Sequence, residues 1–195
     1  MKTLKTIGFW FVQCTWGIIM TLIGAIVALV LIITGHKPKR LGPNIYFEIG
    51  DYWGGLDLGP FFVCCKNCGK TTKLHECGHG IQNMIFGPLF PFLVALPSAL
   101  RYWLRHFDTH LEKSIFNLIY FILAIAITTG LACITGLLLH IKWLTIAIEI
   151  FRLYFISLSI WLSGFEIRKY DKGYVEYDAI WFEGQATYLG EKYYG

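Results

Sequence analysis

Two histidines four residues apart, with a glutamate beside the first, are the residues of this chain best suited to chemistry. His75, Glu76 and His79 form the pattern HExxH within residues 71–86, TTKLHECGHGIQNMIF. On a helix, the two histidines project about 40° apart and one turn apart along the axis. Two imidazoles placed in this way can bind one zinc ion, and the glutamate can reach a water bound to that zinc without being a ligand. The spacing predicts a metal helix over 71–86, with Glu76 as general base.

The alternative for this stretch is a polar turn in an ordinary helix. Gly78 and Gly80 favour the metal site instead. Each glycine costs about 1 kcal/mol relative to alanine in a helix interior, and folding alone does not favour two of them. We therefore expect something to pack close to the backbone there.

A catalytic zinc ion takes three protein ligands and keeps one open position. Besides the acidic residues, the candidates outside the motif are four histidines: His36, His106, His110 and His140. Glu183 has a more suitable context, because residues 177–194 predict a final helix. Its neighbours on one helix face are all small: Ala179, Ala186, Thr187 and Gly190. Such a face lets a helix approach another closely enough to place the carboxylate on a metal.

The composition is typical of a membrane protein. The 195 residues are 55% hydrophobic, and 15% are charged, against about 25% in soluble domains. The mean hydropathy is +0.53. The length suits one domain. The net charge of +4 is modest, and no basic-aromatic pattern indicates nucleic acid as a partner.

Three apolar runs are each long enough to cross a bilayer, which takes about 20 residues. They cover residues 7–34, 115–139 and 143–164. The first run has no formal charge, exceeds the h-region of a signal peptide and precedes a poor cleavage context, so we expect a retained transmembrane helix. Only residues 140–142 separate the other two, which predicts a tight antiparallel helical hairpin.

Glu149 and Arg152 lie within the third run, three residues apart on one helix face. An unpaired charge inside a membrane is costly, so we expect a mutual ion pair turned toward protein. Both a functional and a structural role stay open for this pair.

Two further segments flank the metal helix. Residues 88–104 are apolar but contain three prolines, which argue against a straight span and favour a re-entrant or interfacial segment. Residues 44–64 predict a small β-hairpin, with strands over 44–51 and 56–64. In many zinc peptidases an edge strand holds the substrate by backbone pairing, and a purely structural hairpin is the alternative here.

Six cysteines occur in the chain. Cys65 and Cys68 resemble half of a zinc knuckle, but no second CxxC completes four ligands. A second metal or redox site stays open there, and no disulfide framework is indicated.

The pattern HExGH, a following pair of apolar runs and then Glu183-Gly-Gln-Ala186-Thr187 resemble the membrane metallopeptidases of the HtpX and CAAX prenyl protease type. The resemblance implies zinc as cofactor, His75, His79 and Glu183 as ligands, and Glu76 as base. That family usually has an aspartate where Thr187 stands, and the aspartate orients a zinc-binding histidine. A threonine hydroxyl would do so more weakly. The chain also lacks most of the larger soluble portion of those enzymes.

A closer likeness is to small, uncharacterised bacterial membrane proteins with the pattern HExGHxxQ, then GPL, then PS. Here these are residues 75–82, 87–89 and 97–98, so the likeness covers roughly the first half of the chain. It implies a shared fold and brings no known substrate. Intramembrane site-2 proteases match less well, because their aspartate motif follows HExxH, whereas Leu56-Asp57-Leu58-Gly59 precedes it.

Four other residues are candidates for supporting roles. Gln82 and Asn83 lie one turn beyond the motif and either orient ligands, contact substrate or are merely polar surface residues. Thr187 is the candidate partner of a zinc-binding histidine, and His110 is a candidate oxyanion stabiliser.

The basic residues predict on which side of the membrane the site lies. If residues 88–104 do not cross, three spans put only Lys2, Lys5 and Lys142 opposite the site, and every other lysine and arginine outside the spans on its side. The positive-inside rule then places the site in the cytoplasm. We expect an integral, multi-pass protein of a bacterial inner membrane, encoded by a bacterium or a phage.

The sequence thus predicts a mainly α membrane protein with about three transmembrane helices, a re-entrant or interfacial segment, a small β-hairpin and a zincin-like metal helix. We expect a zinc endopeptidase acting on membrane or membrane-proximal protein substrates. A non-proteolytic scaffold or regulator with a structural or vestigial zinc site is the alternative, and a metal transporter has thinner support. The oligomeric state cannot be read from the sequence.

Overall fold

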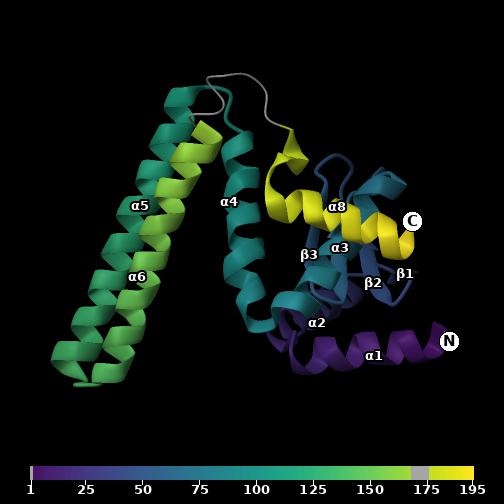
Figure 1. The fold of residues 1–195 in the computed structure, drawn as a ribbon, viewed down its shortest axis with the longest axis horizontal. Helices are drawn as coiled ribbons and strands as arrows, with labels where there is room; N and C mark the ends of the chain where they lie inside the picture. The colour runs from purple at the N-terminus through teal and green to yellow at the C-terminus, as the bar shows by residue number, and fades with distance from the viewer. Residues whose placement is uncertain (1, 168–175) are drawn as a thin grey trace. The chain divides into compact units, whose positions relative to one another are not determined.

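The computed structural model describes residues 2–167 and 176–195 (Figure 1). These residues are mostly helical, with one small sheet. The chain divides into two compact units, one of Met1–Leu96 with Glu176–Gly195 and one of Pro97–Val175. The first unit contains the HExxH helix and the second contains the two longest apolar helices.

The first apolar run folds as two helices, α1 (Lys2–Thr15) and α2 (Ile18–Ile33), which are bent by 99° at the break. The single helix predicted over 7–34 is therefore broken in two; that this run crosses the membrane stays a prediction. Gln13 explains the bend, because this fully buried amide finds its partners on the metal helix. Its Nε2 donates to the Gly80 carbonyl at 2.8 Å, and its Oε1 accepts from Asn83 Nδ2 at 2.6 Å. In a straight apolar helix the same amide would have been left without these partners.

The bend itself is closed by small and polar residues. The Thr21 hydroxyl lies 2.7 Å from the Gln13 carbonyl and 3.0 Å from the Gly17 carbonyl. A Cβ at Gly17 would lie 2.5 Å from Asn83 Nδ2, so a larger residue would push the metal helix away.

A four-stranded sheet packs beside these helices. Its strands are β1 (Lys39–Leu41), β2 (Asn44–Glu48), β3 (Gly55–Leu58) and β4 (Phe61–Cys64), in the order β1-β2-β4-β3. β2 pairs with β4 in parallel, and the other pairs are antiparallel. The predicted two-stranded hairpin over 44–64 is therefore wrong. The second predicted strand turns back on itself at Gly59, whose φ of +77° suits glycine and whose N–H donates to Asp57 Oδ2 at 3.0 Å.

The metal helix α3 (Lys70–Phe86) forms as predicted and packs against α8 (Trp181–Tyr194), which follows a short turn η5 (Tyr177–Ala179) (Figure 1). A side chain at Gly78 would overlap the Ala186 carbonyl, and one at Gly190 would overlap the Leu74 carbonyl. The close approach expected at Gly78 and on the small face around Glu183 is confirmed.

Residues 88–104 belong to a broken helical segment that begins at Gly87 and ends at Arg105. The pieces are η1 (Gly87–Leu89), η2 (Pro91–Ala95) and α4 (Leu96–Arg105). Gly87 ends α3 with a φ of +52°. Pro97 does not interrupt its helix, because it lies in the first turn of α4, where a proline is tolerated. The break confirms that no straight helix covers this segment; its re-entrant or interfacial placement stays a prediction.

The second unit contains the helical hairpin that the sequence predicted (Figure 1). α5 (His110–Cys133) continues into η3 (Ile134–Leu138), and α6 (Lys142–Leu162) continues into η4 (Ser163–Ile167). Residues 110–138 and 142–162 are each long and apolar enough to cross a membrane. α5 begins before the predicted run because Thr109 and Glu112 form a capping box at its start.

The expected ion pair between Glu149 and Arg152 is confirmed at 3.1 Å. Arg152 also donates from Nε to Thr128 Oγ1 at 3.2 Å, so α5 contributes to the pair. The Glu149 side chain remains 46% exposed, so only the arginine end is turned toward protein.

Cys65 and Cys68 are joined to each other in a disulfide. A disulfide sulfur is not a thiolate, so a zinc site at this pair would require its reduction. The disulfide lies in the loop between β4 and α3, where Cys68 Sγ is 3.2 Å from the Gly54 carbonyl.

Candidate metal centre

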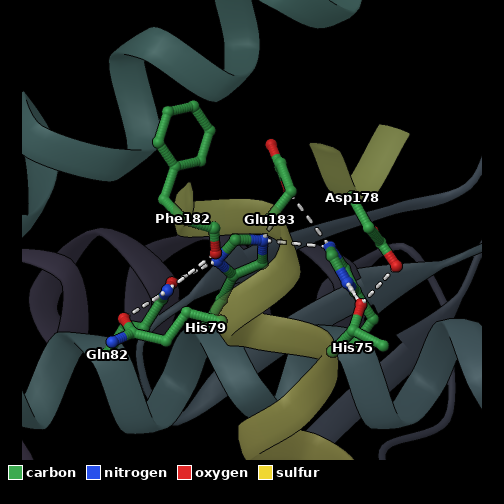
Figure 2. Close-up of polar contacts among 8 residues, drawn as sticks. His75, His79, Gln82, Asp178, Phe182 and Glu183 are labelled. Atoms are coloured by element: carbon green, nitrogen blue, oxygen red, sulfur yellow. Dashed lines mark hydrogen bonds and ion pairs between the residues drawn. The ribbon is translucent and has the colours of Figure 1, made fainter. Parts of the chain in front are cut away.

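Three ligand atoms meet where α3 and α8 cross (Figure 2). His75 and His79 lie one turn apart on α3, and Glu183 lies in the first turn of α8. The two Nε2 atoms are 3.1 Å apart, and each is 3.2 Å from Glu183 Oε2. Glu183 is fully buried. This group can hold a metal ion.

The hydrogen bonds of His79 determine which of its ring nitrogens is free to bind. His79 Nδ1 lies 2.7 Å from Gln82 Oε1. The Gln82 amide nitrogen already donates to the Phe182 carbonyl at 2.7 Å and to Gln185 Oε1 at 2.9 Å. Gln82 Oε1 must therefore accept from Nδ1–H, which leaves Nε2 as the ring nitrogen that faces Glu183 and can offer a lone pair to a cation.

His75 reaches the same state through a different partner. Its Nδ1 lies 2.8 Å from Thr187 Oγ1, and that hydroxyl donates to Asp178 Oδ2 at 3.0 Å. Because the hydroxyl proton goes to Asp178, Thr187 accepts from His75 Nδ1–H, and Nε2 is again the ring nitrogen that faces inward and can bind a cation.

The donor set fits a zinc ion. Ligands at about 2.0–2.1 Å in a tetrahedral arrangement lie about 3.3 Å from one another, close to the spacing here. With both rings neutral, these three atoms offer only lone pairs to one another, and a cation between them would attract all three. Two imidazoles and one carboxylate are a ligand set that zinc prefers, and each imidazole has the hydrogen-bonded support usual in such sites.

Glu76 lies beside this group without joining it. Its side chain is 5% exposed and lies against β3, where a Cβ at Gly55 would come within 2.6 Å of Glu76 Cγ. Burial raises the pKa of Glu76 to about 7; the charge of His75 opposes this shift and that of Glu183 adds to it. A carboxyl group with a pKa near neutrality can both accept and release a proton, which is what a general base and acid must do.

No family model, curated protein or solved structure matches this chain. The likeness to membrane metallopeptidases therefore stays an expectation from the motifs. The site has to be interpreted from its own geometry.

The other candidate residues fall into two groups. Gln82 and Thr187 each contact an imidazole, as described above. Asn83 contacts neither ligand. It donates to Gln13 Oε1 at 2.6 Å and to the Gly17 carbonyl at 3.2 Å, so its amide nitrogen holds the bend between α1 and α2; a contact with substrate stays a prediction. The face of α3 that carries Asn83 is the one on which the bent helices α1 and α2 pack.

His110 begins α5 in the second unit, where it is exposed, and does not belong to the three-residue group. Its role as oxyanion stabiliser stays a prediction.

Asp178 is the site residue that sequence reasoning missed. It lies in η5, and Ile180 between η5 and α8 is extended, with φ −94° and ψ 140°. Helical spacing from Glu183 therefore does not place it. A signal was available in the sequence. Thr187 stands where the family pattern usually has an aspartate, so another acidic residue nearby in the chain was a candidate to replace that carboxylate.

Proposed function

We propose that this chain is a zinc-dependent membrane endopeptidase that hydrolyses peptide bonds of membrane or membrane-proximal proteins. The observation that carries the proposal is the triangle of His75 Nε2, His79 Nε2 and Glu183 Oε2, with the Glu76 carboxyl group beside it. Three ligands leave the fourth position of a tetrahedral ion open, as catalytic zinc sites require.

In peptide hydrolysis the residues of this chain would have the following roles. A bound zinc ion supplies Lewis acidity that activates a water and polarises the scissile carbonyl. Glu76 accepts the water proton and returns it to the departing amine nitrogen. Gln82 and Thr187 hold the two imidazoles in the tautomer that directs Nε2 inward.

The burial of Glu183 supports a resident cation. Glu183 has no exposed surface, and a cation bound between it and the two imidazoles would stabilise its carboxylate in this buried position. The site therefore gains most of its stability when the metal is bound.

The membrane assignment rests on α5 and α6, whose length and apolar surface suit two crossings. Both ends of such a hairpin lie on one side, so the segments before α5 and after α6 share the compartment of the site. These segments hold most of the lysines and arginines, which supports the cytoplasmic side. In that compartment we expect Cys65 and Cys68 to be kept as thiols.

Glu76→Gln in the full chain, purified in detergent, tests the catalytic role. We expect one bound zinc per chain in wild type and variant alike, because Glu76 is not a ligand. Cleavage of a proteome-derived peptide library, read by mass spectrometry, should be detectable for wild type and lost in the variant. Equal cleavage by both proteins would refute the mechanism. Zinc binding without cleavage by wild type would favour a structural site in a non-proteolytic scaffold.

A further inference from the structure

Asp178 is an acidic residue at the site to which neither the HExxH motif nor the family resemblance assigns a role. Its Oδ2 accepts from Thr187 Oγ1 at 3.0 Å, and the same hydroxyl lies 2.8 Å from His75 Nδ1 (Figure 2). The three groups form a chain from an exposed carboxylate to a candidate metal ligand.

A threonine hydroxyl alone does not determine the tautomer of a histidine. It can accept from Nδ1–H, or it can donate to an unprotonated Nδ1. In the second case Nε2 carries the proton and cannot bind a cation. A carboxylate on the far side of the hydroxyl removes this choice, because it takes the hydroxyl proton and leaves only the accepting lone pair for the ring.

We propose that Asp178 is a positioning residue that acts through Thr187 to keep Nε2 of His75 available for the metal. The inference rests on the metal site of the proposed function and adds a residue to it. The family pattern would place a carboxylate at position 187 itself; here the carboxylate comes from η5, one hydroxyl further away.

Zinc affinity of the full chain in detergent, measured by competition with a chromogenic chelator, tests the proposal without any substrate. Loss of a residue that supports a zinc ligand weakens zinc binding by about 10–100-fold. Because Asp178 is exposed, we expect the lower end of this range, about 10-fold, for Asp178→Ala. Thr187→Val should lose about as much. The control is Glu191→Ala, which removes an exposed carboxylate on α8 that is not part of the site. This variant should bind zinc like wild type.

The decisive variant combines Asp178→Ala with Thr187→Asp, which puts a carboxylate directly on His75 Nδ1. We expect this double variant to recover affinity to within about 3-fold of wild type, whereas a general disturbance of η5 would not be repaired at position 187. If Asp178→Ala binds zinc as tightly as wild type, or if Thr187→Asp does not restore the lost zinc affinity, the proposed role of Asp178 is overturned. The metal site itself would still stand. A wild-type chain that binds no zinc would overturn the proposed function as well.

A separate observation concerns the bent pair α1 and α2. At 1.5 Å per residue their 14 and 16 residues are about 21 Å and 24 Å long, so neither crosses a hydrocarbon core of about 30 Å by itself. The bend is held by Gln13, Gly17 and Asn83, and straightening it would break the buried hydrogen bonds of Gln13.

Both helices nevertheless present large apolar side chains outward. Leu4, Ile7 and Phe11 are exposed on α1, as are Leu22, Ile26 and Ile33 on α2. Basic residues stand at both ends of the pair, with Lys2 and Lys5 at the start and Lys37, Lys39 and Arg40 after the end. A straight span would put Lys2 and Lys5 on the opposite side from the others, whereas an elbow leaves all five on one side, which the positive-inside rule favours further.

We infer that α1 and α2 form a re-entrant elbow whose outer face contacts the acyl chains of one leaflet, so that the N-terminus lies on the same side as the C-terminus. Protease protection in sealed vesicles tests this, using epitope tags at both ends of the full chain. A third tag inserted after His140, in the turn between α5 and α6, is the control for the opposite side. We expect both terminal tags to be digested together while the His140 tag is protected. An N-terminal tag protected together with the His140 tag would overturn the elbow.

Discussion

Two helix pairs of this protein, α5 with α6 and α3 with α8, have polar side chains at their contacts, but these side chains are arranged differently in the two pairs. Between α5 and α6 two polar contacts join complementary partners. Asn117 Nδ2 donates to the Ser159 carbonyl at 3.1 Å, and Ser159 Oγ donates to Asn117 Oδ1 at 3.1 Å. Further along, the hydroxyls of Thr135 and Thr145 are 3.0 Å apart. These groups satisfy one another and need nothing from outside.

Between α3 and α8 there are complementary pairs too, such as Gln82 Nε2 with the Phe182 carbonyl, but the three atoms of the candidate metal centre are of one kind. The two Nε2 atoms and Glu183 Oε2 all offer lone pairs, and the protons of both imidazoles are directed to Gln82 and Thr187 on the opposite side of each ring. Donor–acceptor hydrogen bonds stabilise the packing of one helix on another, whereas ligand atoms whose lone pairs converge can bind a cation. This contrast distinguishes a structural polar contact from a candidate metal centre.

The largest expected effect is the loss of metal binding when one ligand is removed. Glu183→Ala takes away one of three ligands, so zinc affinity should fall by roughly 10³-fold, given binding free energies of about 10–16 kcal/mol for structural zinc. The melting temperature of wild type should rise when zinc is added, and that rise should vanish in the variant. Equal zinc-dependent stabilisation of both chains would remove Glu183 from the site.

The next effect concerns the close approach of α3 and α8. Gly78→Leu places a side chain against the Ala186 carbonyl, so we expect destabilisation of about 3 kcal/mol and loss of zinc binding. Gly130→Leu on α5 is the matched control, because a Cβ there meets nothing within 4 Å. Thermal unfolding in detergent with and without zinc measures both. Similar losses in the two variants would mean that the crossing at Gly78 has no special role.

A smaller effect is expected from the complementary contact between α5 and α6. Asn117→Ala leaves the Ser159 hydroxyl without its acceptor, at a cost of about 1–3 kcal/mol. Because this contact holds no ion, the melting temperature should fall by the same amount with and without zinc, and the zinc affinity should not change. A zinc-dependent difference would break the contrast between the two helix pairs.

The smallest effect is expected at Cys65 and Cys68. Replacing both by serine should leave the zinc stoichiometry at one per chain, since the three ligands lie elsewhere. Metal analysis of wild type and variant under reducing conditions measures this. A drop in stoichiometry would identify a second zinc site at the CxxC pair.

The sequence by itself determined the features that depend on local spacing. The helix over Lys70–Phe86, the two imidazoles on one of its faces and the long helices α5 and α6 follow from residues a few positions apart. Helical periodicity also indicated that Glu183 sits among small residues. Each of these is a property of one element, which the chain encodes within a turn or two.

Only the tertiary structure decided how distant segments pair. The bend between α1 and α2 depends on Gln13 reaching Gly80 and Asn83, some 70 residues later. The parallel pairing of β2 with β4 and the contact of Asp178 with Thr187 likewise join groups that no periodic pattern relates. The physical reason is that a buried polar group must find a partner wherever the fold supplies one, and its own neighbours in the sequence do not specify that partner.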